Sequence, residues 1–450
     1  MAFSRTLGFL VLFPTLLVAQ RARESGGMAA ATAVDRQRVA AGFWAEARYN
    51  YAYWDAVRAN WDSAFSATLS YIAGRPVPTD VQFVRRLRRW GMLLNDGQFE
   101  LLPPAPIAGR VARPPLALRS IERRPFIMDY ATNDEMRVAR PERLAEIVAV
   151  QGIPAADWIR DSVLPEISAG TEPNRWERAV THMLEGERGT ALHLLLRLPG
   201  GVERGASVTR SVPIAARWPL EPPAFEADTL PDGAIWIRIS SFADADIPER
   251  LARALGEAAG EGPRHRGLIL DFRETTWTAG GRDNGYAILT RLIERPFLTS
   301  RWRTPQYRPA YRGADSPDSA GAWLQAPSDT VWPLSRRQGI PYTGPVAVLV
   351  SARTAGPAED FLVAFRAGNR GAIIGETSAG STGQTAVVPL PAGWQVRVTV
   401  TRDAFPDGRE FVRTGIAPDF PVELRVEDVL AGRDAMLERA RAYLSELARR

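Results

Sequence analysis

The side chains that could do chemistry in this sequence are mainly hydroxyls and carboxylates. The sequence has no cysteine and no lysine, so all 56 residues counted as lysine or arginine are arginine. The three histidines are His182, His193 and His265. A cysteine nucleophile, disulfides, cysteine-ligated zinc and a lipoprotein anchor are therefore excluded. Arginine keeps its proton at any working pH and cannot act as a general base. A hydrolytic site here must rely on hydroxyls, carboxylates or one of three imidazoles, and we expect no metal or cofactor.

Residues 342–384 form the stretch most typical of a catalytic scaffold. An apolar run at 346–350 is followed by a tight turn, an amphipathic pattern at 358–366 and a second apolar run at 372–374. This order predicts a strand, an elbow, a helix and a strand of a parallel sheet. Hydrolytic enzymes hold a nucleophile at the helix N-cap of such an elbow, beside backbone N–H groups that stabilise an oxyanion. Here the cap is Gly356, which has no side chain to react.

Two further motifs flank this stretch, DFRETTWTAGGRDNGYAIL at 271–289 and DGREFVRTGIAPDF at 407–420. With the elbow they resemble the tail-specific, or C-terminal processing, serine peptidase family, in particular the branch with the tricorn core and the bacterial retinoid-binding-protein-like hydrolases. The resemblance extends from about Phe43 onward. It implies an α/β fold with a crotonase/ClpP-like spiral core and a parallel sheet, preceded by an N-terminal helical region and a PDZ-like, β-rich module.

These features divide the chain into parts. We expect a signal peptide at 1–22, an N-terminal helical region at 30–112, a PDZ-like domain at 113–215 and a peptidase-like α/β core at 216–450. The aromatic residues of the helical region recur on apolar faces and predict packed core. Proline, alanine and arginine at 103–115 predict a linker. The arginine- and aromatic-rich stretch that begins at 299 predicts a long surface loop.

The resemblance also assigns positions in the site. Gly356 stands where the family has its serine, and Gln98, in LLNDGQFEL, stands where one branch has its general-base histidine. An amide can fill a histidine's place and bond to its neighbours, but it cannot take a proton from a hydroxyl. Pro357 follows the nucleophile position and lacks the N–H that often stabilises the oxyanion. The family's glutamate position is Val412, and Glu410 could swing in, although a solvated edge carboxylate is the simpler interpretation.

The family's oxyanion and substrate loop is glycine-rich, and here only Gly280 and Gly281 remain, with bulky Trp277 in the turn. The loop that carries the lysine in Ser–Lys members reads GETSAGSTGQ and supplies Ser378 and Ser381. An active hydrolase with a displaced serine is therefore an alternative. It would use Ser381 or Ser351, with Glu376 or Glu410 as the base.

The three histidines are interpreted as structural rather than catalytic. His182 comes near a helix end, His193 falls within an apolar strand pattern, and His265 belongs to a polar loop. None lies in a motif that the family uses for its base. An oligomer completed by neighbouring copies would supply only the same three histidines.

The N-terminus and the overall charge bear on location and partners. A basic start and an apolar run from Leu7 to Ala19 predict a secretory signal and a periplasmic or secreted protein. The run is too short, and contains Pro14, for a stable membrane anchor. A net charge of +5 without a basic block does not favour nucleic-acid binding. We expect peptides or unfolded protein segments as partners, and a homo-oligomer is left open.

The combined substitutions lead to one hypothesis. Gly356, Pro357, Gln98 and Val412, with no lysine or cysteine, remove the nucleophile, the base and an oxyanion donor. Removing such groups from a serine hydrolase costs orders of magnitude in rate. We therefore predict an exported protein of the tail-specific peptidase fold whose proteolysis is lost or greatly reduced and which acts by binding.

Overall fold

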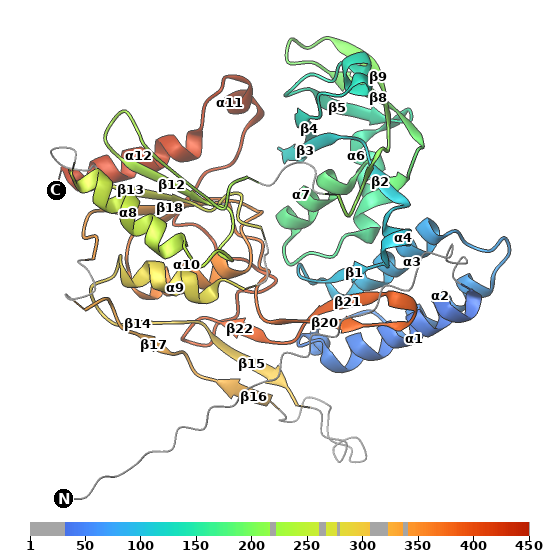
Figure 1. The fold of residues 1–450 in the computed structure, drawn as a ribbon, viewed down its shortest axis with the longest axis horizontal. Helices are drawn as coiled ribbons and strands as arrows, with labels where there is room; N and C mark the ends of the chain where they lie inside the picture. Colours follow the sequence, from blue (N-terminus) through green and yellow to red (C-terminus); the bar gives the residue numbers. More distant parts are fainter. Residues whose placement is uncertain are drawn as a thin grey trace, which may run out of the picture.

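The structure is a computed structural model, and it describes residues 32–216, 222–260, 267–276, 280–306, 323–335 and 341–449. It is a mixed α/β fold with several sheets (Figure 1). The predicted signal peptide at 1–22, the surface loop with His265, and Trp277 lie outside the described residues. None of the helices in the described ranges combines the length and apolarity needed to cross a bilayer.

A six-stranded sheet, here called the core sheet, holds the elbow. Its order is β11(Phe225–Thr229), β12(Ile235–Ile239), β13(Leu268–Asp271), β18(Val346–Val350), β19(Ala372–Gly375) and β23(Phe420–Pro421). β11 is antiparallel to β12, and the other pairs are parallel. The predicted parallel strands at 346–350 and 372–374 are therefore confirmed. Because β13, β18 and β19 run the same way, the segments that follow them meet at one edge of the sheet, where α/β folds commonly place their sites.

Helices cover both faces of the core sheet (Figure 1). α8(Ile247–Gly260), α9(Arg282–Thr290) and α10(Pro357–Ala367) pack on one face, and α12(Ala435–Ala448) packs on the other. Alternate residues of β18 serve the two faces, since Val348 joins the cluster around Phe361 whereas Leu349 joins the cluster around Ala440. The strands are buried on both sides, which explains their unbroken apolar runs.

The N-terminal helices are α1(Ala33–Asn50), α2(Trp61–Ala73) and α3(Asp80–Gly91). The predicted aromatic core is confirmed: the ring of Phe43 lies 5.4 Å from that of Trp61 and 4.7 Å from that of Trp90, both edge-to-face. After α3, β1(Glu100–Leu102) pairs with β21(Gln395–Thr399), which pairs with β20(Thr385–Pro389). The N-terminal region and the C-terminal part thus share a three-stranded sheet.

The prediction of a linker at 103–115 is wrong. This segment forms α4(Ala105–Ala108) and β2(Val111–Arg113), and β2 lies between β10(Val212–Pro213) and β7(Gly186–Glu187). Local composition missed these elements because the partners of β2 come from distant parts of the sequence.

A second six-stranded sheet lies in the middle of the chain. It contains β3(Leu116–Ile121), β4(Arg124–Tyr130), β5(Glu146–Val150), β6(Ile153–Pro154), β8(Ala191–Arg197) and β9(Glu203–Thr209), with β6 beside β5. Its helices are α5(Asp134–Ala139), α6(Ala155–Trp158) and α7(Glu172–His182). The predicted pair of alternating strands around the turn at 199–201 is confirmed as β8 and β9. β3 is an end strand and packs against α7.

The stretch from 299 to 334 is not the single loop that its composition predicts. It contains β15(Arg301–Pro305), β16(Trp323–Ala326) and β17(Thr330–Val331), which pair with one another, with β14(Phe297–Leu298) or with β22(Arg402–Ala404). Residues 307–322, with Tyr307 and Tyr311, lie outside the described residues. The remaining helix is α11(Val426–Leu430).

Candidate active site

The elbow between β18 and α10 is held by backbone and threonine hydrogen bonds. The hydroxyl of Thr354 donates to the carbonyl of Phe272 (2.8 Å) and accepts from the N–H of Ser351 (2.9 Å). The N–H of Gly356 donates to the carbonyl of Ser381 (2.9 Å), and the carbonyl of Gly356 accepts the first helical bond, from Glu359 (2.9 Å). The turn is therefore fixed to the residue after β13 and to the loop after β19.

The backbone of Gly356 has φ 61° and ψ −129°, a conformation that L-residues other than glycine adopt at a cost of order 1–3 kcal/mol. Sharp, strained turns of this kind expose the nucleophile in hydrolases that carry a serine at the elbow. Pro357 follows as the first residue of α10 and is buried. The elbow therefore keeps its sharp backbone turn while offering neither a hydroxyl at 356 nor an N–H at 357.

Glu359, in the first turn of α10, anchors the loop after β19. Its fully buried carboxylate accepts hydrogen bonds from the hydroxyl of Ser378 and from the N–H groups of Gly380 and Ser381, both at 2.7 Å. Burial raises the pKa of Glu359 to about 7, against the lowering effect of these three donors. The structure makes this residue the link between elbow and loop.

We expect this carboxylate to give the fold a measurable pH dependence. The folded-state pKa of Glu359 lies above that of an exposed glutamate, so the folded protein holds this proton more tightly. Its contribution to stability is full below about pH 4.3 and is lost as the pH rises to about 7. Glu359→Gln removes the titration. Between pH 5 and pH 8, the free energy of unfolding measured in urea should fall by on the order of 2 kcal/mol more for wild type than for this variant. A constant difference would show that Glu359 does not titrate in this range.

Gln98 lies in the turn after α3 and is 1% exposed. Its Nε2 donates to the hydroxyl of Thr399 (3.2 Å), which donates to a carboxylate oxygen of Asp96 (2.8 Å). Burial raises the pKa of Asp96. The Oε1 of Gln98 has no hydrogen-bond partner among the described residues. The hydrogen bond from Nε2 to Thr399 thus orients the amide, and the Oε1 atom remains available as an acceptor.

Gly97 brings this turn against the loop that carries Ser381. A Cβ added at Gly97 would lie 2.4 Å from the Oγ of Ser381, so only glycine permits the approach. The backbone carbonyl of Ser381 also accepts a hydrogen bond from the N–H of Gly356. The positions assigned to the nucleophile and the base therefore lie on either side of one residue, although they are far apart in the sequence.

A cavity of about 480 Å³ opens beside this junction. Its lining includes Gly97, Thr276, Ala355 and Ser381, and it extends along α7 and β1. The Oγ of Ser381 is buried and has no hydrogen-bond partner in the described part of the chain. The junction of elbow, loop and turn thus faces a space large enough for part of a peptide, and we refer to it below as the elbow cavity.

Residues 234–422 match the model of peptidase family S41. The chain carries a peptidase family S41 domain. It is also similar to a chloroplastic C-terminal processing peptidase from Tetradesmus obliquus, 26% identical over 261 residues. That match covers 55% of this chain and spans about half (49%) of the relative's length.

Among solved structures, the chain is similar to mature CPAF complexed with lactacystin. The TM-score is 0.69 at 14% identity, over 92% of this chain and 98% of that chain. Mature CPAF matches with a TM-score of 0.68 at 15% identity, over 92% and 97% of the two chains. At these identities the likeness establishes the fold.

Elements outside the matched residues complete the S41 domain's site. Gly97, next to Gln98, and five residues of α7 precede residue 234, yet they line the elbow cavity. Asn174, near the start of α7, donates from its side-chain amide to the carbonyl of Ala352 in the elbow (2.8 Å). Asn174 was not predicted as a site residue. No local signal marks it, because its partner is distant in the chain.

Glu410 is not brought to the elbow. Its carboxylate accepts from Arg303 (2.9 Å) and from two nitrogens of Arg402 (3.1 and 2.9 Å), at the edge where β15 and β22 pair. Its side chain is 34% exposed. Val412, at the family's acid position, is buried. The half-exposed, ion-paired arrangement agrees with the simpler interpretation of Glu410, and the idea that it swings into the site has no geometric support.

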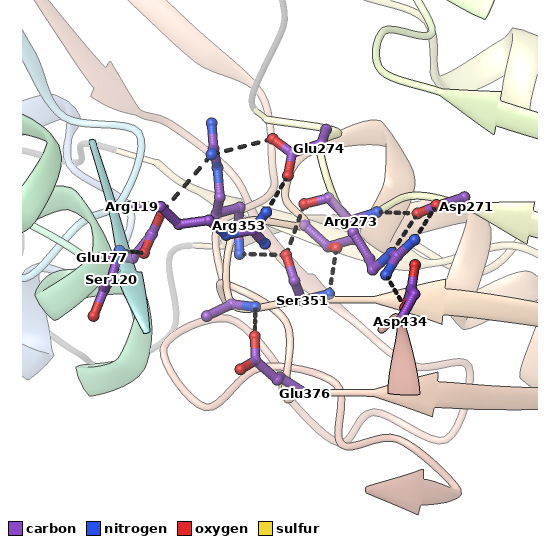
Figure 2. A network of polar contacts seen from close by, with 12 residues as sticks. Arg119, Ser120, Glu177, Asp271, Arg273, Glu274, Ser351, Arg353, Glu376 and Asp434 are labelled. Atoms are coloured by element: carbon purple, nitrogen blue, oxygen red, sulfur yellow. Dashed lines mark hydrogen bonds and ion pairs between the residues drawn. The ribbon is translucent and has the colours of Figure 1, made fainter. Parts of the chain in front are cut away.

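Ser351 and Glu376 lie in the network of Figure 2 but do not bond to each other. The hydroxyl of Ser351 donates to the carbonyl of Arg273 (2.7 Å) and accepts from the N–H of Arg353 (3.1 Å). Glu376 accepts from the N–H of Ala352 (3.2 Å). Ser351 is therefore a bonded structural hydroxyl in this arrangement rather than a nucleophile with an adjacent base.

The remaining predicted residues lie away from the junction. Gly281 caps α9, and a Cβ there would lie 2.4 Å from the carbonyl oxygen of Phe242, whereas one at Gly280 would meet open space. His182 bonds through Nδ1 to Glu185 (2.7 Å) at the far end of the elbow cavity, and His193 is exposed on β8. Within the described ranges, no group of three or more histidine, aspartate and glutamate side chains is placed to hold a metal ion.

Proposed function

We propose that this protein is an S41-type scaffold that binds peptides or unfolded protein segments and has lost most or all of its proteolytic activity. The observation that carries the proposal is Gly356 at the cap of α10, in the sharp backbone turn that would present a nucleophile. A carbonyl-attacking centre requires an atom that attacks and a base that accepts its proton. Gly356 supplies no such atom, and Gln98 is not a base in the physiological pH range.

The surroundings support binding as the retained function. The elbow cavity remains open beside the junction, and its lining includes polar atoms that have no hydrogen-bond partner among the residues that the structure describes. In the same proposal, the middle sheet with α7 is a PDZ-like module and the core sheet belongs to a crotonase/ClpP-like spiral core. Export to the periplasm or beyond is also part of the proposal, and it rests on the N-terminal apolar run alone.

The direct test is an activity assay on the purified protein. We expect no turnover of unfolded casein and no labelling by a serine-reactive fluorophosphonate probe, while fluorescein-labelled unfolded casein binds. The matched control is the same protein heated until it is unfolded, which should lose the binding. Clear casein turnover or labelling of a single serine would overturn the loss of catalysis.

One observation favours a second candidate, a hydrolase that uses Ser381. Its hydroxyl lines the elbow cavity and is not committed to another group in the described residues, unlike those of Ser351 and Ser378. The nearest carboxylate in the hydrogen-bond network, Glu359, bonds to the N–H of Ser381 rather than to its hydroxyl. If casein turnover is found, Ser381→Ala should abolish it and Ser351→Ala should not.

A further inference from the structure

One face of α7 forms a wall of the elbow cavity. The residues of α7 that line it are Asn174, Glu177, Arg178, Thr181 and His182, a spacing that places them in one stripe along the helix. At 1.5 Å per residue this stripe is about 12 Å long, the length of three to four residues of extended peptide. The stripe starts at the elbow, where Asn174 bonds to Ala352.

The lining of the elbow cavity also includes a strand whose second edge has no partner strand in the described residues. Residues 99–103, which include β1, line the same cavity. In the described residues β1 pairs with β21 alone and ends its three-stranded sheet, and Figure 1 shows β1 between β21 and α7. An extended peptide can add to such an edge by main-chain hydrogen bonds, with a helix covering its other side.

Arg178 is a cation in a lining whose carboxylates, Glu100, Glu166 and Glu177, each pair with another arginine. Its Nη1 donates to the carbonyl of Gly97 (2.7 Å), and within the described ranges no carboxylate lies within ion-pair distance of it. The other arginines of the lining are each paired with a glutamate: Arg88 with Glu185, Arg353 with Glu274, and Arg397 with Glu100. Burial lowers the pKa of Arg178, against the raising effect of the charges of Glu100 and Asp96.

Ser381 adds a second unsatisfied group at the same place. Its Oγ lies against Gly97, the residue to which Arg178 donates, and it has no hydrogen-bond partner in the described part of the chain. A hydroxyl and a guanidinium can both donate to an anion, and here each lies against Gly97. A carboxylate is the anion that a peptide carries, either on a side chain or at its C-terminus.

We infer that the elbow cavity takes an extended peptide that adds as a strand to the free edge of β1 and places a carboxylate against Arg178, beside Ser381. This inference rests on the proposed peptide-binding function and names its recognition element. Arg178 is then the residue that sets specificity. A second cavity borders the end strand β3. It is less suited to the addition of a peptide strand, because the N–H of Ser120 on β3 already donates to Glu177 (2.8 Å).

The experiment measures anisotropy of three fluorescein-labelled octapeptides of alternating valine and threonine. One has a free C-terminal carboxylate, one is its C-terminal amide, and one is the amide with a single internal aspartate. Wild type should bind one or both carboxylate peptides at least about 10-fold more tightly than the neutral amide. The peptide that binds more tightly shows whether a C-terminal or a side-chain carboxylate is recognised.

Variants separate recognition from folding. Arg178→Gln should remove the preference, so that the carboxylate peptides bind with the same Kd as the neutral amide, and Arg178→Lys should retain part of the preference. The matched control is Arg175→Gln, because Arg175 also lies on α7 and donates to one backbone carbonyl, that of Leu164 (2.7 Å), but does not line the elbow cavity. It should keep the full preference.

The outcomes are distinguishable from failure of the proposed function. Equal binding of all three peptides by wild type, or an equal loss for all three in Arg178→Gln, overturns the carboxylate contact and leaves peptide binding standing. No binding of any peptide or of unfolded casein overturns both. Bound peptide should also slow amide hydrogen exchange at residues 100–102, and unchanged exchange there overturns the strand addition to β1.

Discussion

The variant Gly356→Ser, Pro357→Ala, Gln98→His is expected to react with a fluorophosphonate probe and to cleave unfolded casein, which wild type should not do. Serine at 356 would stand at the cap of α10, where the turn is already fixed by the bonds from Gly356 to Ser381 and from Glu359 to Gly356. Alanine at 357 restores an N–H beside it. Histidine at 98 would place an imidazole in the turn after α3, which lies against Ser381 on the side away from Gly356. We expect casein turnover at least about 10²-fold above the background rate measured with wild type.

The controls for this prediction are the two variants that lack one component. Pro357→Ala with Gln98→His has no nucleophile and should neither label nor cleave. Gly356→Ser with Pro357→Ala has no added base and should label slowly at most, because an unassisted hydroxyl is a weak nucleophile. If the triple variant is folded by circular dichroism and still fails to label, the elbow and the Gln98 turn are not aligned for catalysis.

Arg282→Met is expected to destabilise the fold by about 3–5 kcal/mol, because it strips the counter-ion from buried carboxylates. Arg282, at the start of α9, pairs through Nε with Asp360 on α10 (2.9 Å) and through Nη2 with Asp403 on β22. Both carboxylates are at most 2% exposed, and burial raises the pKa of Asp403 to about 6 even with the arginine present. The loss should be largest at pH 8 and smaller at pH 5, where the unpaired carboxyls can take up protons.

The matched control for Arg282 is Arg366→Met. Arg366 lies at the other end of α10 and pairs with Asp419 (3.1 Å), but both side chains are more than 30% exposed. Its removal should cost less than about 1 kcal/mol in urea unfolding. An equal decrease in the free energy of unfolding for the two variants would show that burial does not increase the contribution of the Arg282 ion pairs to stability.

Local periodicity was sufficient to predict the part of the fold around the elbow. The runs at β13, β18 and β19 are apolar because both faces of the core sheet are covered, and α10 follows from its repeated apolar positions. The strands near 301–331 were missed because their residues are arginine- and tryptophan-rich, and their pairing partner β22 comes about a hundred residues later. Strand pairing of this kind depends on distant sequence.

The same distinction applies to the candidate site. Gly356 and Pro357 could be placed by pattern because a strand, a turn and a helix follow one another there. The contact of Gly97 with Ser381, and of Arg178 with Gly97, joins segments about 280 and 80 residues apart, and no local pattern predicts such contacts. Glu410 appeared close to the acid position by counting, yet its arginine partners on β15 and β22 hold it at a sheet edge.

The way Gly356 is bonded has an evolutionary consequence. It contributes only main-chain groups to the turn, and the carboxylate that holds the neighbouring loop comes from Glu359. Position 356 can therefore exchange serine for glycine without losing a structural hydrogen bond, and glycine even relieves the strained φ. A serine at 356 would bear the strain of this turn, so it is expected to persist only where its chemistry is selected for, and glycine is the more stable residue where it is not.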